Sequence, residues 1–157
     1  MRSRYALVAV TIALLGPLGA VRAVAQDATP TATTLTLVER AVRVTTVDLG
    51  TSGPSIGDLI VWGPDPLYDA ANSVDTGATT QGVCVLFQVS GDCIATESIA
   101  FPDGSTLEIQ GIQAAGAQPS SRTIVGGSGQ YLGATGTVSI EPSADLTTWT
   151  KTFEFGS

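Results

Sequence analysis

Histidine is absent from this sequence, and basic residues are few: seven Lys and Arg stand against fourteen Asp and Glu among 157 residues. Without histidine the chain lacks the commonest general base and the commonest metal ligand, which excludes Ser-His-Asp catalysis and histidine-bearing zinc sites. The formal net charge of −7 repels nucleic acid and anionic membrane surfaces, although it also serves solubility. We therefore expect no nucleic-acid partner, no metal and no cofactor.

Long apolar runs are also scarce, and the one that stands out lies at the N-terminus. Arg2 and Arg4 precede an apolar stretch over residues 5–18, and the small residues Ala23-Val24-Ala25 follow. This pattern is typical of a secretory signal peptide, and the stretch is too short and wrongly flanked for a spanning helix. We expect cleavage after Ala25, with Ala20 or Ala23 as alternatives; a retained membrane anchor is the competing interpretation.

Three segments are predicted from this: a signal peptide over residues 1–25, a disordered tail rich in Thr and Ala over 26–33, and a single domain over 34–157. Removal of the leader takes away three of the seven basic residues and changes the formal charge to −10. We expect a secreted, extracytoplasmic protein with no membrane span in its mature form.

Short β-branched runs separated by turn residues fill the predicted domain, and no segment is typical of a helix. Pro102-Asp103-Gly104 between two alternating runs is a strong hairpin signal. The run 34–47 changes phase between Leu37 and Val42, which predicts a bulge or two short strands. About eight strands with turns at this spacing predict a sandwich or a barrel.

Glycines cluster at 126–129, which invites a phosphate-loop interpretation. No Lys-Ser/Thr pair follows, and residues 134–140 alternate as a strand does, so no helix N-terminus is available to hold phosphate. Nucleotide binding is therefore rejected.

Two cysteines, Cys84 and Cys93, are present, and disulfides persist in an exported chain. A bridge between them closes a loop of about ten residues and contributes roughly 2.5–3 kcal/mol in the chain-entropy model. A tight hairpin at Ser90-Gly91-Asp92 would not place the two cysteines opposite each other, so the predicted bridge requires a wider loop.

The order of three motifs resembles the allene oxide cyclase and dirigent-like barrel superfamily. The motifs are Gly57-Asp58-Leu59-Ile60-Val61-Trp62 with Asp65-Pro66-Leu67-Tyr68, then Gly82-Val83-Cys84-Val85-Leu86-Phe87-Gln88, then the run from Gly126 to Gly136. The resemblance implies an eight-stranded antiparallel, calycin-like β-barrel, often a homotrimer, with an apolar cavity at one mouth. Members of this group position a reactive lipid epoxide or phenolic intermediate during cyclisation.

Residue by residue, the resemblance can be carried over only in part. Asp65 aligns with the aspartate of the dirigent D-P-L motif, and Cys84 with a pocket cysteine of the cyclases. The first-strand Glu and Asn of the cyclases align with Thr36 and Val38, so Glu39 replaces that acid only after a register shift.

Candidate site residues are chosen by the chemistry of their side chains and by the face of the predicted strand on which they lie. Asp65, at an apolar barrel mouth, is the candidate catalytic acid, with a turn residue as the alternative. Glu97 alternates in phase with an apolar face, so it is either an inward acid of the pocket or a residue of an outer face. The candidate ligand-binding aromatics are Trp62, Tyr68, Phe87 and Tyr131, for which core packing is the alternative.

Two further groups are interpreted as structural. Lys151 shares a face with Trp149, and we expect its ammonium to reach solvent at a barrel end. Asp69, Asn72 and Asp75 lack the spacing of a calcium loop, so they are interpreted as a solvated turn.

Two functions of different class are consistent with these residues. One is a secreted cyclase or isomerase of the allene oxide cyclase type acting on a small apolar lipid or phenolic molecule. The other is a barrel without catalysis, either a binding module for such a molecule or a structural unit.

Overall fold

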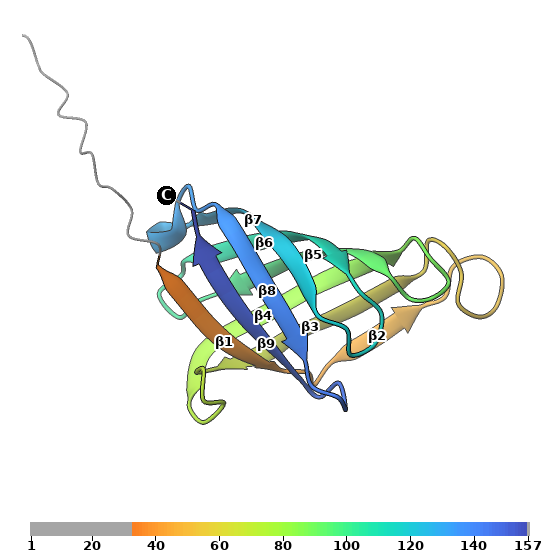
Figure 1. The fold of residues 1–157 in the computed structure, drawn as a ribbon, viewed down its shortest axis with the longest axis horizontal. Helices are drawn as coiled ribbons and strands as arrows, with labels where there is room; N and C mark the ends of the chain where they lie inside the picture. The colour runs from red at the N-terminus through yellow and green to blue at the C-terminus, as the bar shows by residue number, and fades with distance from the viewer. Residues whose placement is uncertain (1–32, 157) are drawn as a thin grey trace, which may run out of the picture.

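The computed structural model describes residues 33–156 and folds them into a barrel of antiparallel strands (Figure 1). The predicted signal peptide and, except for Thr33, the predicted tail lie outside the described residues. Within those residues no helix is long and apolar enough to cross a membrane.

Nine strands are paired in the order β1-β9-β8-β7-β6-β5-β4-β3-β2, and a further pairing of β1 with β3 closes the sheet. The strands are β1 (Thr34–Arg40), β2 (Val44–Val47), β3 (Leu59–Tyr68), β4 (Asp75–Leu86), β5 (Cys93–Ala100), β6 (Thr106–Gln113), β7 (Ser120–Ser128), β8 (Gly136–Pro142) and β9 (Thr148–Phe155), with a 3₁₀ turn η1 (Gly129–Tyr131) before β8. Because β1 and β2 both pair with β3, they are two halves of one barrel strand. The predicted eight-stranded antiparallel barrel is confirmed.

The interruption between β1 and β2 confirms the phase change seen in the sequence. β2 pairs with β3 as far as Trp62, and β1 pairs with it from Leu67 onward. Gly63 N still donates to Arg43 O at 2.9 Å, but residues 64–66 of β3 lie opposite the gap between the two halves and have no strand partner on that side. Pro64 and Pro66 are therefore tolerated, and β3 continues to Tyr68 although prolines usually end a strand.

The two ends of the barrel are filled differently. Toward the end where β1 begins and β9 ends, inward side chains from most strands form one apolar cluster that includes Ile99, Leu107 and Phe153. Phe101, Tyr131 and Phe155 pack against that cluster and cover this end. We call it the closed end.

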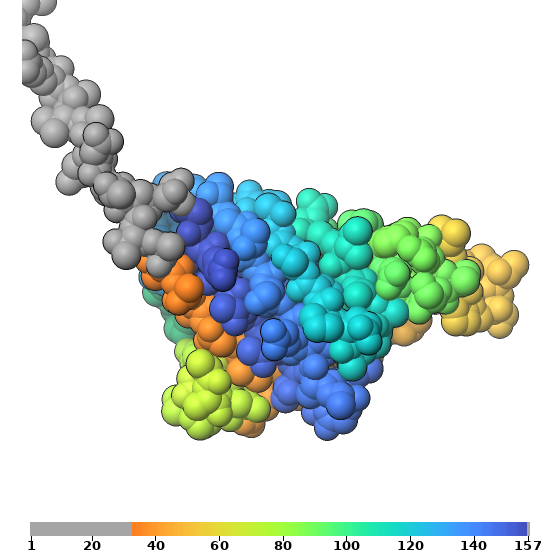
Figure 2. Space-filling view, in the orientation of Figure 1, coloured from red at the N-terminus to blue at the C-terminus, as the bar shows by residue number. Residues whose placement is uncertain are grey.

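The opposite end carries a smaller buried cluster, made of Cys84, Leu86, Cys93 and Ala95. The connections β2–β3, β4–β5, β6–β7 and β8–β9 surround it, and the β2–β3 segment projects furthest from the barrel (Figures 1 and 2). Buried Asp58 anchors that segment, because its carboxylate accepts hydrogen bonds from Leu49 N at 2.8 Å and Ser55 N at 2.7 Å. We call this the open end.

Candidate functional site

A cavity of about 390 Å³ lies at the open end of the barrel. Its walls are mostly apolar, with Ile60, Trp62 and Ile140 on strands and Leu146 on the β8–β9 connection. Ala114 and Gly116, from the β6–β7 connection, lie at its edge. A cavity of this size and character is typical of a site for one small molecule.

Four charged side chains lie on the inner side of this cavity, and we call them the inner quartet: Glu39, Glu97, Arg122 and Lys151. The Lys151 ammonium is 2.7 Å from Glu39 Oε2 and also pairs with Glu97 Oε1. Arg122 Nη1 donates to Glu97 Oε2 at 2.8 Å. The four groups come from β1, β5, β7 and β9, so the network connects strands around the barrel.

Neutral polar groups add hydrogen bonds to the quartet, although Arg122 Nε is buried without a partner among the described residues. Thr80 Oγ1 donates to Glu97 Oε1 at 2.5 Å, and Arg122 Nη2 donates to Gln113 Oε1. Buried charges are costly unless they are paired and hydrogen-bonded in this way. With two carboxylates and two cations, the quartet has no net charge when all four groups are ionised.

The pKa directions follow from burial and from the pairs. Burial raises the pKa of the Glu39 carboxyl, and the pull of Lys151 does not cancel it because Glu97 and Asp65 add repulsion. Burial acts on Glu97 in the same direction, but Lys151 and Arg122 outweigh it and its pKa is lowered. Burial lowers the pKa of the Lys151 amine, yet Glu39 and Glu97 together raise it above the ordinary value. Lys151 therefore stays an ammonium, and Glu39 is the carboxyl that takes up a proton most readily.

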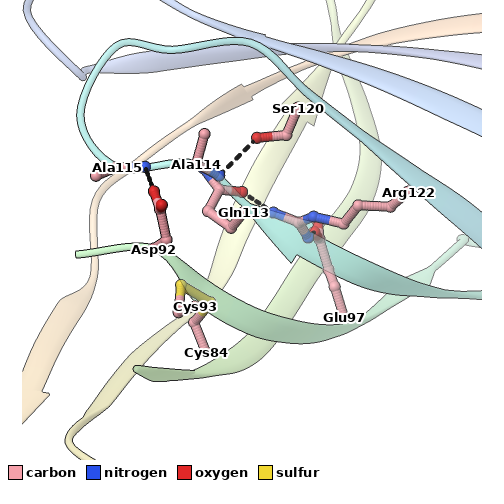
Figure 3. Close-up of a disulfide and its surroundings, with 9 residues drawn as sticks. All are labelled: Cys84, Asp92, Cys93, Glu97, Gln113, Ala114, Ala115, Ser120 and Arg122. Atoms are coloured by element: carbon pink, nitrogen blue, oxygen red, sulfur yellow. Dashed lines mark hydrogen bonds and ion pairs between the residues drawn. A yellow bond between two sulfur atoms is a disulfide. The ribbon is translucent and has the colours of Figure 1, made fainter. Parts of the chain in front are cut away.

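The predicted disulfide is confirmed (Figure 3). Both of its cysteines line the cavity. Cys93 is in register with Leu86, so Cys84 lies diagonally across the two strands with a Cα–Cα distance of 5.5 Å. This diagonal placement, with the loop 87–92 beyond it, is the wider geometry that the sequence required. Next to the bridge, Asp92 Oδ1 accepts a hydrogen bond from Ala115 N at 2.9 Å, which fixes the β4–β5 connection to the β6–β7 connection.

Asp65 is fully buried beside the cavity, but it is not one of the residues that line it. Its Oδ1 accepts hydrogen bonds from Val42 N at 3.2 Å and Arg43 N at 3.0 Å, two of the three amides in the gap between β1 and β2. Its Oδ2 has no hydrogen-bond partner among the described residues. The side chain of Asp65 thus accepts the hydrogen bonds that a backbone carbonyl of a neighbouring strand would otherwise accept, and it fixes the backbone between β1 and β2.

The other sequence-predicted residues are divided between the two ends. Trp62 and Glu97 line the cavity. Tyr131 stacks on Phe155 at the closed end, with ring centroids 5.7 Å apart. The guanidinium of Arg40 lies over the ring of Tyr68, with Cζ 3.6 Å from the ring centroid. Phe87 is half-buried and follows directly after β4.

Sequence reasoning missed Glu39, Arg122 and Trp149 as cavity residues, and it misplaced Lys151. Lys151 is 1% exposed and ion-paired, so it does not reach solvent at a barrel end as expected. One signal in the sequence could have found this pair. Glu97 and Lys151 each alternate with apolar residues that face the barrel interior, and buried charges of opposite sign pair with one another.

Asp69 belongs to a turn, as its neighbours indicated. Its Oδ1 accepts from Ser73 N at 2.7 Å and Val74 N at 3.0 Å, and these hydrogen bonds lower its pKa, with the bond from Val74 having the larger effect. Arg40 Nε donates to Asn72 Oδ1 at 2.8 Å and joins this turn to β1. Among the described residues no cluster of acidic or cysteine side chains could hold a metal ion.

A family model described as "Dirigent-like protein" matches residues 25–156. The chain belongs to the dirigent-like family. The resemblance read from the motifs is thereby confirmed on its dirigent side, and the name allene oxide cyclase describes the chain only approximately. No curated protein matches the sequence.

Solved structures with the same barrel include enzymes of different chemistry. A pyocyanin demethylase superposes with a TM-score of 0.67 at 18% identity, covering 79% of this chain and 100% of that one. A pterocarpan synthase dirigent protein, GePTS1, superposes with a TM-score of 0.61 at 19% identity, covering 80% of this chain and 83% of that one. The Diels Alderase AbmU from Streptomyces koyangensis superposes with a TM-score of 0.57 at 17% identity, covering 80% of this chain and 69% of that one. At these identities the likeness shows the fold.

Proposed function

We propose that this protein binds one small apolar molecule in the open-end cavity and steers its cyclisation or isomerisation. The observation that carries the proposal is the combination, in one cavity, of apolar walls with a fixed and neutralised set of charges. An apolar wall supplies binding by removing ligand surface from water. Fixed charges, which need no reorganisation during the reaction, then act on polarity that develops in the bound molecule.

The polar roles are assigned to Glu39 and Lys151. Both line the cavity, and the ion pair between them uses one oxygen of the Glu39 carboxyl, Oε2. Because its pKa is raised by burial, Glu39 is suited to give a proton to a ligand oxygen or to take one from it. Lys151, which remains an ammonium, stabilises negative charge on that oxygen. Asp65 acts indirectly, since it shapes the β1–β2 gap beside the cavity. The solved structures named above support this proposal, because their names describe small-molecule chemistry and they share the same barrel.

The experiment is a binding titration followed by a search for turnover. Purified protein is titrated with the neutral fluorescent probe N-phenyl-1-naphthylamine, and native mass spectrometry is run on protein from its own host. We expect saturable 1:1 probe binding and a host-derived apolar molecule that is converted by wild type but not by Glu39→Gln. Absence of probe binding would contradict the proposal.

The alternative is a binding module without catalysis. It is favoured by one observation: the charges of the quartet pair with one another, and Glu97 in particular is held by Lys151, Arg122 and the hydroxyl of Thr80, so these charges have a structural explanation. If wild type and Glu39→Gln hold the same host-derived molecule unchanged, this alternative is correct.

We further propose that the protein self-associates, as the homotrimer implied by the family does, through the outer face of β2 to β6. One register row on that face, which we call the outer row, is entirely aliphatic: Val47, Leu59, Val85, Ile94 and Ile112. Ile94 is 41% and Ile112 53% exposed. An uncharged row lets copies of an acidic protein meet without burying like charges.

Sedimentation velocity tests the outer row directly. We expect a trimer for wild type and a monomer for Ile94→Lys. Leu132→Lys, at an exposed site on the closed end, is the matched control and should stay trimeric. A monomeric wild type would contradict this proposal and leave the cavity proposal intact.

We also propose that the protein is secreted after cleavage of residues 1–25. The disulfide supports this, because such bridges persist in oxidising compartments. N-terminal sequencing of protein from culture medium should begin at Gln26; recovery of uncleaved protein from cells alone would contradict secretion.

A further inference from the structure

Trp62 occupies the space that a side chain at position 82 would need. Trp62 and Gly82 are register partners on β3 and β4. A Cβ atom built on Gly82 would lie 2.3 Å from Cζ2 and 2.7 Å from Cη2 of the indole. No other residue type would leave room for the ring there.

The backbone does not explain this glycine. Gly82 is not among the residues with positive φ, so its conformation suits other residues. Close approach explains it instead, because the same Cβ would also lie 2.6 Å from the Thr96 carbonyl oxygen. Gly126 on β7 shows the contrast: a Cβ there would meet nothing within 4 Å. Gly82 therefore serves as a seat for the indole of Trp62.

The seat determines how far the indole reaches into the cavity. Trp62 lines the cavity and packs against the cluster that contains the disulfide, and Gly82 is in register with Glu97 of the inner quartet. The ring thus packs against the cluster that contains the disulfide, and its far edge lies over Gly82, the register partner of Glu97. Any residue larger than glycine would displace the ring, and a smaller side chain at position 62 would enlarge the cavity.

We propose that Trp62, seated on Gly82, sets the width of the cavity and is the residue that determines ligand size. This inference rests on the proposed function, since it concerns the ligand of the same cavity. The proposal also gives a role to Gly82, the first residue of the second motif, to which the proposed function assigns none.

Ligand size is tested with neutral aromatic hydrocarbons of increasing width: naphthalene, phenanthrene and pyrene. Each competes with bound N-phenyl-1-naphthylamine on wild type, Trp62→Phe and Trp62→Ala. Hydrophobic pockets discriminate related sizes by about 10- to 200-fold. We expect the ratio of pyrene to naphthalene affinity to rise about tenfold or more in Trp62→Ala, with Trp62→Phe in between.

Gly82→Ala tests the seat from the other side, and Gly126→Ala is its matched control. The added methyl group should push the indole into the cavity and weaken pyrene and phenanthrene more than naphthalene, while Gly126→Ala leaves all three unchanged. The indole N–H resonance of Trp62 should shift in Gly82→Ala and not in the control. Should Gly82→Ala fail to fold, because the Thr96 carbonyl is also in the way, the Trp62 variants decide the question.

The outcomes separate this inference from the proposed function. If wild type binds the probe but Trp62→Ala keeps the wild-type size ranking, the inference is wrong and the proposed function stands. If wild type binds no probe and Trp62→Ala does, the inference is supported and the proposed function fails. If neither protein binds any probe, both are contradicted.

Discussion

The two ends of this barrel use the same strands for opposite purposes. At the closed end, inward residues of β5 to β9 are aliphatic or aromatic, and they fill the interior. At the open end, the continuation of the same strands carries Glu97, Arg122 and Lys151 beside a cavity. Close packing stabilises the first end without specific chemistry. The second end contains groups that cost free energy to bury, and such exceptions to a consistent core are expected at functional sites.

The largest effect that separates the ends is expected from Lys151→Met. Loss of the ammonium leaves Glu39 and Glu97 buried with too little positive charge, which should cost about 3–5 kcal/mol of unfolding free energy near neutral pH. Urea denaturation of wild type and variant measures this loss. Glu39→Gln combined with Lys151→Met removes one charge of each sign and should lose less than Lys151→Met alone.

The loss of unfolding free energy in Lys151→Met should also depend on pH. The pKa of Glu97 is lowered in the folded protein, so its ionisation contributes stability above its ordinary pKa of 4.5, and that contribution is lost as pH falls through the lower folded value. The pKa of Lys151 is raised, so its contribution is present below its ordinary pKa of 10.5 and lost as pH rises through the higher folded value. The deficit of Lys151→Met should therefore shrink as pH falls, because protonation neutralises the carboxylates that the lost ammonium leaves without a partner. A deficit that is equal at pH 4 and pH 8 would show that the ion pairs do not cause it.

Phe153→Ala is the matching change at the closed end. Phe153 is fully buried, and truncation of such a side chain costs about 3–5 kcal/mol through lost burial and the void that remains. Because the surrounding residues are apolar, the loss should be the same at pH 5 and pH 8, and probe binding at the open end should be unchanged. A pH-dependent loss would contradict the separation of the two ends.

Replacement of both Cys84 and Cys93 by serine should have a smaller effect. The bridge closes a short loop, so its loss should cost about 2.5–3 kcal/mol by thermal or urea unfolding in the chain-entropy model. Probe affinity should fall as well, since the bridge is part of the cavity wall. Reduction of the wild type with dithiothreitol should reproduce both effects; an unchanged affinity would mean that the wall is held by the strands alone.

Tyr131→Phe is expected to have the smallest effect. The ring stacks at the closed end, so removal of its hydroxyl group should change stability by less than about 0.5 kcal/mol and leave probe affinity unchanged. A clear loss of affinity would place Tyr131 in the ligand site.

Local patterns in the sequence were sufficient for the fold but not for the site. Alternation and turn residues predicted a sandwich or a barrel, and the resemblance of three motifs to the dirigent-like superfamily favoured the barrel. The phase change in 34–47 predicted a bulge or two short strands, and the structure has two strands there, β1 and β2. The period of two gives the face of a residue but not its partners, so Lys151 was placed on the inner face while its pairing with Glu39 and Glu97 was missed.

Long-range register explains the other differences. Leu37, Val38 and Glu39 are all buried, so alternation could not single out Glu39. The role of Asp65 depends on the gap opposite β3, which exists only once β1, β2 and β3 are paired. The contact of Trp62 with Gly82 likewise joins two motifs that lie apart in the sequence.

The most direct test is an NMR titration of the isotope-labelled protein with N-phenyl-1-naphthylamine. The chain has two tryptophans, Trp62 and Trp149, and both line the cavity, so their indole N–H resonances report on it. We predict saturable shifts in both indoles and in the amides of Gly91, Ala115 and Gly116, with no change at Phe101, Tyr131 or Phe155. Shifts confined to the closed end or the outer row, or no shift at saturating probe, would contradict the account.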